Sequence, residues 1–469
     1  MSFIDPNYDH ITSIPCLATP PSYHEFLHNY LIPNVPVLIG PALTTGWRAR
    51  CDWVRPNPDC HGEEAISEKI PRFVPDFAFL IDRFGDAPVQ VADCRRREFT
   101  DQPRVGMMFA DFVEKWGTSV VESEGEMKND QVRDIEAKWE HDSDRTRYYL
   151  KDWHFVKAFP EYGAYKTPDI FRDDWMNEFW HTRNDVRDDY RFVYMGGHGT
   201  FTPFHADVYR YRSRYLLLES FVYFYFSHAS YLLPIVCRSY SWSANICGIK
   251  RWTLFHPGQE HLFKDKLGNM VYDVRDVDPA RFSRFAEARR IVLLQRDGET
   301  LFVPSGWFHQ VENIGSTISI NHNWSNACNL PYLHTSFVAD LGEVRYALRD
   351  LIDLLPSPEF ERECQRLLLV NSGWDWIVLW RMCACIMQRL RRQLEGEDGD
   401  KGTPMELQPP VGFQAKRILD VMMGLLAETE AGKVVGKWYE EEGGMEVGTG
   451  EEAVEEMVRE LKGLVEEYE

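Results

Sequence analysis

Two residues in the segment TPFHADV, His205 and Asp207, have the types and spacing of a metal-binding pair. If this segment is a strand, residues i and i+2 point to the same face, so one imidazole and one carboxylate can bind one ion. Far downstream, in VPSGWFHQV, His309 follows a Pro-Ser-Gly turn. Two histidines and one carboxylate that leave three coordination positions open form the facial triad of non-haem iron(II) centres. The three residues therefore predict an iron(II) site with room for further ligands.

The open positions suit 2-oxoglutarate, which would chelate the iron at two of them, and O₂ at the third. Lys250, in ICGIKRWTLF, follows Asp207 on a strand-turn-strand pattern, and a buried lysine is costly unless it is paired. A dicarboxylic cosubstrate would pair it, with the hydroxyl of Thr202 as a second donor. Taken singly these signals are weak, because the chain has 15 histidines. His309 as a core histidine and Lys250 as a solvated hairpin residue are the competing interpretations.

The region 148–330 has the pattern needed to position such a site. Short apolar runs such as RFVYMG, RWTLFHP and TISINHNW alternate with Gly and Pro, which predicts many short strands in a sandwich or barrel. The motif RDGET (296–300) predicts a hairpin turn, because Asp-Gly supplies the positive φ angles such turns need. We therefore expect a mainly β core.

Helical and mixed segments flank this core. Residues 1–147 combine a Ser-capped helix at 22–32 with strands at 35–40 and 88–93, and are expected to pack on the core as an α/β segment. The charge-dense stretch 120–147 is interpreted as a solvated helix or loop. From 331 to 469 apolar residues recur at helical spacing, interrupted by a polar linker at 395–410, and the chain ends in a charged amphipathic helix.

Composition narrows the possible partners. With 44% hydrophobic residues the chain can form a large core, and a net charge of −21 makes nucleic acid a poor partner. A basic peptide or protein substrate suits the negative electrostatic field of this chain better. The ten cysteines lack CxxC pairs, which argues against structural zinc and for reduced, intracellular thiols. No signal peptide is evident at the N-terminus, so the expected location is the cytoplasm, with a nuclear pool left open.

Four motifs together resemble the small JmjC-domain hydroxylases: TPFHAD, SWSANICGIKRWTLFHPG, LFVPSGWFHQVENI and TISINHNW. The resemblance is strong over about 148–330 and weaker over the N-terminal part. It implies a double-stranded β-helix, the cupin-like jelly roll, with a helical C-terminal region. It also implies iron(II), 2-oxoglutarate and O₂ as cofactors. In relatives such C-terminal helices mediate dimerisation or substrate docking, and the sequence leaves both roles open.

The resemblance also assigns pocket residues. By similarity Thr202 and Lys250 hold the distal carboxylate of 2-oxoglutarate, Tyr149 is a third hydroxyl donor, and Asn323 matches a pocket amide. Ser243 falls where several relatives carry Asn, which puts that contact in doubt. Three tryptophans are either pocket-lining residues or ordinary core aromatics: Trp242, Trp307 and Trp324.

The second metal ligand bears on the reaction class. Histone demethylases of the JmjC group usually carry Glu there and protein hydroxylases usually carry Asp, so Asp207 favours hydroxylation. The stretches VADCRRREFTDQPR, YYLKDWHF and DDWMNEFWHTR most resemble the subfamily that hydroxylates a lysine of the eukaryotic translation termination factor. The alternatives are an N-methyl-lysine demethylase and a non-catalytic cupin-like binding protein.

An anomalous segment interrupts the β-rich region at about 210–237. It is rich in aromatics, and deleting it yields HADVYRSYSWSANICG, which has the family spacing. Its Glu, His, Ser and Pro residues and its place inside a barrel argue against a membrane span. A genuine lid is a second interpretation. A retained intron in the gene model is the one we favour, and it leaves open whether the chain as written is active.

Overall fold

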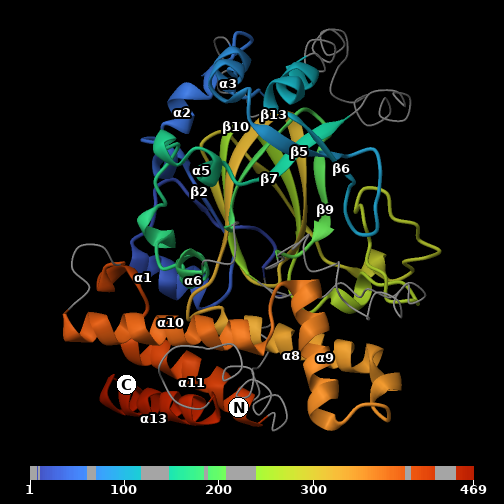
Figure 1. Ribbon diagram of the computed structural model, residues 1–469. Coiled ribbons are helices and arrows are strands. Elements are labelled where there is room, and N and C mark those ends of the chain that lie inside the picture. The colour runs from blue at the N-terminus through green and yellow to red at the C-terminus, as the bar shows by residue number, and fades with distance from the viewer. Residues whose placement is uncertain are drawn as a thin grey trace.

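In the computed structural model a strand-rich barrel lies in the middle, the helices Ala49–Asp52 and Phe77–Phe84 lie towards one end, and the C-terminal helices lie at the other end, next to the first helix, Tyr23–Phe26 (Figure 1). It describes residues 8, 11–60, 70–117, 147–183, 189–207, 239–396, 403–427 and 450–468. The anomalous segment 210–237 and the charged stretch up to residue 146 lie outside the described residues. No helix in the described ranges is both long and apolar enough to span a membrane.

Two long strands organise the barrel. β10 (Tyr240–Phe255) and β13 (Phe308–Trp324) pair antiparallel along their whole length. Their first and second halves have different outer neighbours. β10 pairs with β12 (Thr300–Val303) through 241–244 and with β11 (Ile291–Gln295) through 250–254. β13 similarly pairs with β9 (Phe201–His205) and then β8 (Arg191–Gly196). The two strands thus contribute to both walls of the barrel.

A bulge lets β10 pass from one wall to the other. The register with β13 shifts between Asn245 and Cys247 and again before Ile249. Gly248 has φ +81°, and a Cβ there would lie 2.2 Å from the carbonyl oxygen of Ser316. Only glycine fits such a close approach in a left-handed conformation. Lys250 follows directly after this bulge, so the bend helps to set the position of its side chain.

The wall that contains β12, the first half of β10, the second half of β13 and β8 is the larger one, and strands of the N-terminal segment extend it. The strand order is β1-β2-β12-β10-β13-β8-β7-β5-β6. The outer strands are β1 (Cys16–Leu17), β2 (Val37–Ile39), β7 (Tyr148–Trp153), β5 (Pro88–Asp93) and β6 (Arg104–Met108). A separate pair joins β3 (Val54–Pro56) to β4 (Phe73–Pro75). Short helices cover this wall: α1 (Tyr23–Phe26) with the π-helical turn Leu27–Leu31, α2 (Ala49–Asp52), α3 (Phe77–Phe84), α5 (Phe155–Ala158) and α6 (Trp175–Thr182).

The core behind the larger wall is aromatic. Phe26 of α1 meets Phe302 of β12 edge-on at 5.1 Å between ring centroids, and Phe171 stacks on Trp242 at 5.4 Å. Such pairs bury large apolar areas in specific geometries. They fix the larger wall rigidly, so that residues on its other face are held in place.

The C-terminal helices form a second apolar cluster. They are α8 (Leu330–Ala347), α9 (Ser357–Ser372), α10 (Trp376–Glu395), α11 (Val411–Ala427) and α13 (Gly450–Tyr468). Phe337, Trp376 and Leu461 belong to the buried cluster they share with α6. Arg389 of α10 joins this region to the barrel side, with Nη2 3.1 Å from Asp173 and Nη1 2.8 Å from Glu178 of α6.

Replacing Arg389 with alanine is expected to destabilise the protein by about 3–5 kcal/mol, because it leaves Asp173 buried without its cation. Chemical denaturation of the two proteins measures the difference. Arg366→Ala removes an exposed partner of Glu363 at 3.9 Å and should cost less than about 1 kcal/mol. Equal transition midpoints for Arg389→Ala and wild type would contradict the docking role.

The expected fold class is confirmed: a mainly β, cupin-like core with flanking helices and a helical C-terminal region. The strands expected at 35–40 and 88–93 are β2 and β5, and the Ser-capped helix at 22–32 is present. The hairpin expected at RDGET is wrong. The turn exists, with Gly298 at φ +87°, but among the described strands β11 and β12 do not pair with each other. Both pair with β10 instead, on different halves.

Candidate metal centre

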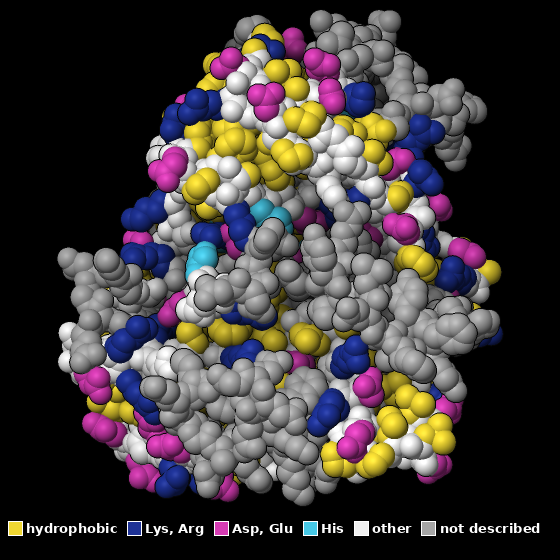
Figure 2. Space-filling model, viewed as in Figure 1, with side chains coloured by type: hydrophobic (Ala, Val, Ile, Leu, Met, Phe, Trp, Pro, Cys, Tyr) yellow, Lys and Arg dark blue, Asp and Glu magenta, His cyan; other side chains and the backbone are white. Residues whose placement is uncertain are grey.

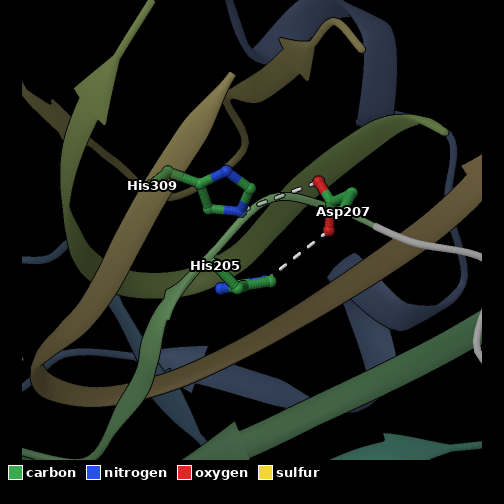
Figure 3. A group of neighbouring side chains, drawn as sticks. All are labelled: His205, Asp207 and His309. Atoms are coloured by element: carbon green, nitrogen blue, oxygen red, sulfur yellow. Dashed lines mark ion pairs between the residues drawn. The ribbon is translucent and has the colours of Figure 1, made fainter. Parts of the chain in front are cut away.

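His205, Asp207 and His309 converge on one point inside the barrel (Figure 3). His205 ends β9 and faces His309 of β13 in register, so strand pairing brings the two imidazoles together. Asp207 Oδ1 lies 3.7 Å from His205 Nε2, and Oδ2 lies 3.6 Å from His309 Nε2. One ligand atom from each residue falls within 4.8 Å of the others. In the part of the chain that the structure describes, no other group of three such ligands is found.

Backbone contacts fix the orientation of both imidazoles. Nδ1 of His205 lies 2.7 Å from the carbonyl oxygen of Pro203, and Nδ1 of His309 lies 3.0 Å from that of Trp307. A carbonyl only accepts, so each Nδ1 carries the proton and each Nε2 offers its lone pair. Both lone pairs therefore face the carboxylate of Asp207, as metal binding requires.

The charges of the three ligands also suit a cation. Burial lowers the pKa of His309 to about 4, so its imidazole is neutral at neutral pH. Burial alone would raise the pKa of Asp207, but the two imidazoles and Ser241 bring it down to about 2. A buried carboxylate needs a positive partner, and the neutral imidazole of His309 does not supply one. The donor set of two nitrogens and one oxygen fits iron(II).

Ser241 holds the metal-binding carboxylate. Ser241 is the second residue of β10, and its Oγ donates to Oδ2 of Asp207 at 2.5 Å. The contact occupies one carboxylate lone pair and restricts rotation of the side chain. Partners of this kind orient metal ligands without touching the metal.

Ser241→Ala should weaken metal binding about tenfold, because Asp207 loses its orienting donor. Titration of the purified protein with iron(II) under anaerobic conditions measures this affinity. Ser243→Ala is the matched control, since Ser243 lies two residues further along the same strand and its Oγ forms no hydrogen bond with any described residue. An unchanged iron(II) affinity in Ser241→Ala would refute the role of this hydrogen bond.

Lys250 of β10 is a buried lysine inside the barrel. Lys250 is 2% exposed, its Nζ donates to Ser319 Oγ at 2.5 Å, and it lies 5.6 Å from the ring centroid of Tyr194. Among the described residues no carboxylate pairs with it. Burial lowers its pKa to about 7. An anionic ligand at Nζ would supply the missing charge, so the site fits the distal carboxylate of 2-oxoglutarate.

Some buried polar atoms on the strands that carry this lysine have no hydrogen-bond partner among the described residues. Burial raises the pKa of Tyr149, whose hydroxyl has Thr202 and Asn313 as its polar neighbours. Ser243 and Asn321 are directly opposite each other on β10 and β13, on the face that carries Ser241. Ser243 Oγ and Asn321 Oδ1 are buried and have no hydrogen-bond partner among the described residues. Buried polar atoms are rarely left unpaired, which indicates that a polar ligand completes the pocket.

The other predicted pocket residues divide between two faces. Asn323 pairs with Ser241 in register and lies on the same face of β13 as Ser319. Trp242 and Trp324 point the opposite way, into the aromatic core behind the larger wall. Trp307 belongs to a third cluster, where its Nε1 donates to the carbonyl oxygen of Asn34 at 3.0 Å. The structure therefore assigns all three tryptophans to the core, because side chains alternate along a strand and Ser241 takes the metal-facing position.

Five residues of the site were missed: Tyr194, Ser241, Asn313, Ser319 and Asn321. The alternation in TISINHNW could have found Ser319 and Asn321, since both are polar and two residues apart and alternate with the apolar Ile318 and Ile320. Tyr194 and Ser241 carry no comparable signal. Their role depends on the pairing of β8, β10 and β13, which are far apart in the chain.

Comparisons with known proteins agree with this geometry. A profile of the cupin-like domain family matches residues 23–329. The chain is 38% identical over 369 residues to the arginine-specific demethylase JMJ20 of Arabidopsis thaliana, covering 76% of this chain and 65% of that relative. It is 34% identical over 426 residues to the 2-oxoglutarate and iron-dependent oxygenase JMJD4 of Gallus gallus, covering 88% and 85%. The Homo sapiens protein of the same name is 32% identical over 422 residues, covering 88% and 84%.

Proposed function

We propose that this chain, which belongs to the cupin-like domain family and is an iron- and 2-oxoglutarate-dependent JmjC oxygenase, hydroxylates a lysine in a protein substrate. The observation that carries the proposal is the combination, in one barrel, of a three-residue metal centre with a buried lysine that has no carboxylate partner among the described residues. Iron(II) with 2-oxoglutarate and O₂ supplies an oxidant: one oxygen atom enters a C–H bond, and 2-oxoglutarate becomes succinate and CO₂.

The chain's own residues would perform four tasks. His205, Asp207 and His309 hold the metal and leave coordination positions open. Lys250 with the hydroxyl groups of Tyr149 and Thr202 binds and orients the cosubstrate. The aromatic core behind the larger wall keeps that face of the site dry. The rest of the barrel mouth is left to bind the substrate.

Two features favour hydroxylation of the translation termination factor. The carboxylate ligand is Asp207 and not Glu, and three stretches resemble the subfamily with that substrate. We place the activity in the cytoplasm, where translation terminates, and leave a nuclear pool open. Homodimerisation through 331–469 is part of the same proposal. Nucleic acid and membrane are not proposed as partners.

The test uses the purified full chain with iron(II), 2-oxoglutarate, O₂ and a termination-factor fragment. We expect succinate, together with a mass gain of one oxygen atom on a lysine of the fragment. Succinate without that mass gain would refute the substrate and leave the oxygenase intact. Absence of iron binding would favour a non-catalytic binding protein.

A demethylase is the second candidate, because the Arabidopsis relative is named an arginine-specific demethylase. Hydroxylation of an N-methyl group gives a carbinolamine, which breaks down to formaldehyde and the demethylated amine. Formaldehyde release from N-methyl-lysine or N-methyl-arginine peptides, without a retained oxygen, would identify this outcome. The same metal centre and Lys250 would be needed in both cases.

The segment 210–237 bears on whether the chain as written is active. The backbone N–H of Ser239 donates to the carbonyl oxygen of Asp207 at 3.2 Å, so the residues on either side of the segment are neighbours in space. Without 210–237 only three residues would join them, and this distance suits such a tight connection. We propose that the segment is a retained intron. Sequencing transcripts across the junction tests this, and a message that always contains the segment would refute it.

A further inference from the structure

Asp152 of β7 has a left-handed backbone conformation that residues with a side chain adopt uncommonly. Its φ is +60°, and the pairing of β7 with β8 is irregular between Leu150 and Trp153, so Asp152 lies in a bulge. Strained residues of this kind persist where the surrounding contacts hold them, and they concentrate at functional sites. The contacts of the Asp152 side chain therefore indicate what this conformation does.

The carboxylate of Asp152 links Tyr194 of β8 to Arg104 of β6. Its Oδ1 accepts a hydrogen bond from the hydroxyl of Tyr194 at 2.5 Å, and its Oδ2 forms an ion pair with Nη2 of Arg104 at 2.5 Å. Nη1 of Arg104 also donates to the carbonyl oxygen of Lys151 at 3.0 Å. Because one guanidinium binds both this carboxylate and the backbone just before it, the Asp152 side chain is held in one orientation.

The charges around Asp152 neutralise one another. Asp101 forms an ion pair with Lys151 at 2.7 Å and lies 3.6 Å from Arg104, so two carboxylates face two cations. On the face of the molecule shown in Figure 2, acidic and basic side chains of the described residues are likewise intermingled. These four described residues thus leave no net charge for an external partner, and the effect of Asp152 falls on the residue that it contacts, Tyr194.

Tyr194 lies against the lysine of the cosubstrate pocket. It is directly opposite Ser319 in the pairing of β8 with β13, and Ser319 Oγ is the atom that accepts from Nζ of Lys250. The ring centroid of Tyr194 is 5.6 Å from that Nζ and 5.9 Å from the ring centroid of Tyr149. The face of an aromatic ring attracts an ammonium group, so the position of this ring helps to determine where the ammonium group lies.

We propose that Asp152 is a positioning residue for cosubstrate binding: it holds the ring of Tyr194 against Lys250, the residue that binds the distal carboxylate of 2-oxoglutarate. The inference rests on the assignment of Lys250 to that carboxylate, which is part of the proposed function. When Asp152 no longer accepts the hydrogen bond, the ring of Tyr194 can move, and binding of 2-oxoglutarate then has to order it. Preorganised contacts raise affinity because this ordering is already complete in the free protein.

The test measures the dissociation constant of 2-oxoglutarate for the full chain loaded with iron(II), by isothermal titration calorimetry without O₂. Asp152→Gly should weaken binding about threefold to tenfold, because glycine adopts the positive φ without strain and only the side-chain contacts are lost. Asp152→Asn should bind within about twofold of wild type. Asparagine tolerates the same φ, and its amide oxygen still accepts from Tyr194, although the ion pair with Arg104 is lost.

A double-mutant cycle tests whether Asp152 acts through Tyr194. Tyr194→Phe keeps the ring and removes the hydroxyl, so it should weaken 2-oxoglutarate binding by a factor similar to that of Asp152→Gly. The two changes combined should weaken binding no further than either one alone, because both break the same hydrogen bond. Two independent contacts would instead give the product of the two factors.

A second Arg–Asp–Tyr contact in the same chain supplies the matched control. Asp52 of α2 accepts from Nε of Arg48 and from the hydroxyl of Tyr162, each at 2.7 Å. Tyr162 belongs to the aromatic core behind the larger wall, on the side away from Lys250. Asp52→Ala and Tyr162→Phe should therefore leave the dissociation constant of 2-oxoglutarate unchanged.

Several outcomes would overturn the inference. They are unchanged binding in Asp152→Gly, equal weakening by Asp152→Gly and Asp152→Asn, multiplied effects in the double variant, or equal weakening by the Asp52 control. Melting temperatures check that the variants are folded, and if Asp152→Gly does not fold, Tyr194→Phe compared with Tyr162→Phe tests the same contact.

Lys250→Met separates a failure of this inference from a failure of the proposed function. If Lys250→Met binds 2-oxoglutarate as wild type does, the assignment of Lys250 is wrong and the inference fails with it. If Lys250→Met binds weakly while Asp152→Gly binds normally, the cosubstrate site stands and the positioning role of Asp152 is wrong. Weak binding by both, together with a non-additive double variant, would support the inference.

Discussion

Asp207→Ala is expected to reduce succinate production to the background of the assay and to weaken iron(II) binding severely. Asp207 is the one anionic ligand of the centre, and its carboxylate oxygens lie 3.7 Å from His205 Nε2 and 3.6 Å from His309 Nε2. Without it a divalent cation would meet two neutral nitrogens and no compensating charge in a buried site. Without a bound metal, 2-oxoglutarate would have no open coordination positions to occupy.

Two readouts make this prediction specific. Anaerobic titration gives the iron(II) affinity, and succinate production gives the turnover. Asp169→Ala is a suitable control, because the Asp169 side chain is 61% exposed and pairs only loosely with Arg172 at 3.5 Å. Unchanged succinate production in Asp207→Ala would refute the ligand assignment. Retained iron binding with lost turnover would instead indicate that His205 and His309 suffice to hold the metal.

The metal centre shows what a sequence can specify and what it cannot. His205 and Asp207 follow from strand periodicity, because two residues on one strand face need no information about the rest of the fold. His309 is separated from them by about a hundred residues, and only the pairing of β9 with β13 brings it close. The resemblance to a known family supplied this long-range pairing. Periodicity alone left His309 as readily a core residue.

The tryptophans and the RDGET turn show the same limit from the other side. Whether Trp242 or Ser241 faces the metal depends on which face of β10 is covered by aromatic residues such as Phe171. A local pattern of polar and apolar residues does not say which face that is. At RDGET the local turn chemistry is correct, yet β11 and β12 diverge because each pairs with a different half of β10. Turn signals specify a turn, whereas the partners of the flanking strands are set by the whole barrel.

Lys250→Met is expected to raise the KM for 2-oxoglutarate at least about tenfold, because a charge-assisted contact to a carboxylate is lost. The same substitution should stabilise the protein in the absence of cosubstrate. Burial lowers the pKa of Lys250 from 10.5 to about 7, so the folded state binds this proton more weakly than the unfolded state does. A methionine of similar length removes that cost, which is on the order of 4 kcal/mol at pH 7.

The pH dependence follows from the same shift in pKa. Below pH 7 the lysine is protonated in both states and the full cost is present. Between pH 7 and 10.5 the unfolded state still binds the proton and the folded state does not, so the stability contributed by this group rises with pH. The free energy of unfolding of wild-type protein should therefore increase across this window relative to that of Lys250→Met. The difference in free energy of unfolding between Lys250→Met and wild type should be largest below pH 7 and shrink as the pH rises towards 10.5.

Lys151→Met provides the matched control, because Lys151 is equally buried but has a carboxylate partner, Asp101, at 2.7 Å. Removing Lys151 takes from Asp101 its nearest cation and leaves Arg104 at 3.6 Å, so this variant should be less stable than wild type, the opposite sign from Lys250→Met. Denaturation curves of the three proteins without 2-oxoglutarate decide between the two behaviours. If Lys250→Met were less stable than wild type and bound 2-oxoglutarate normally, Lys250 would be a structural lysine. A more stable variant that has lost its cosubstrate would show that the barrel keeps this charge unpaired for a ligand to complete.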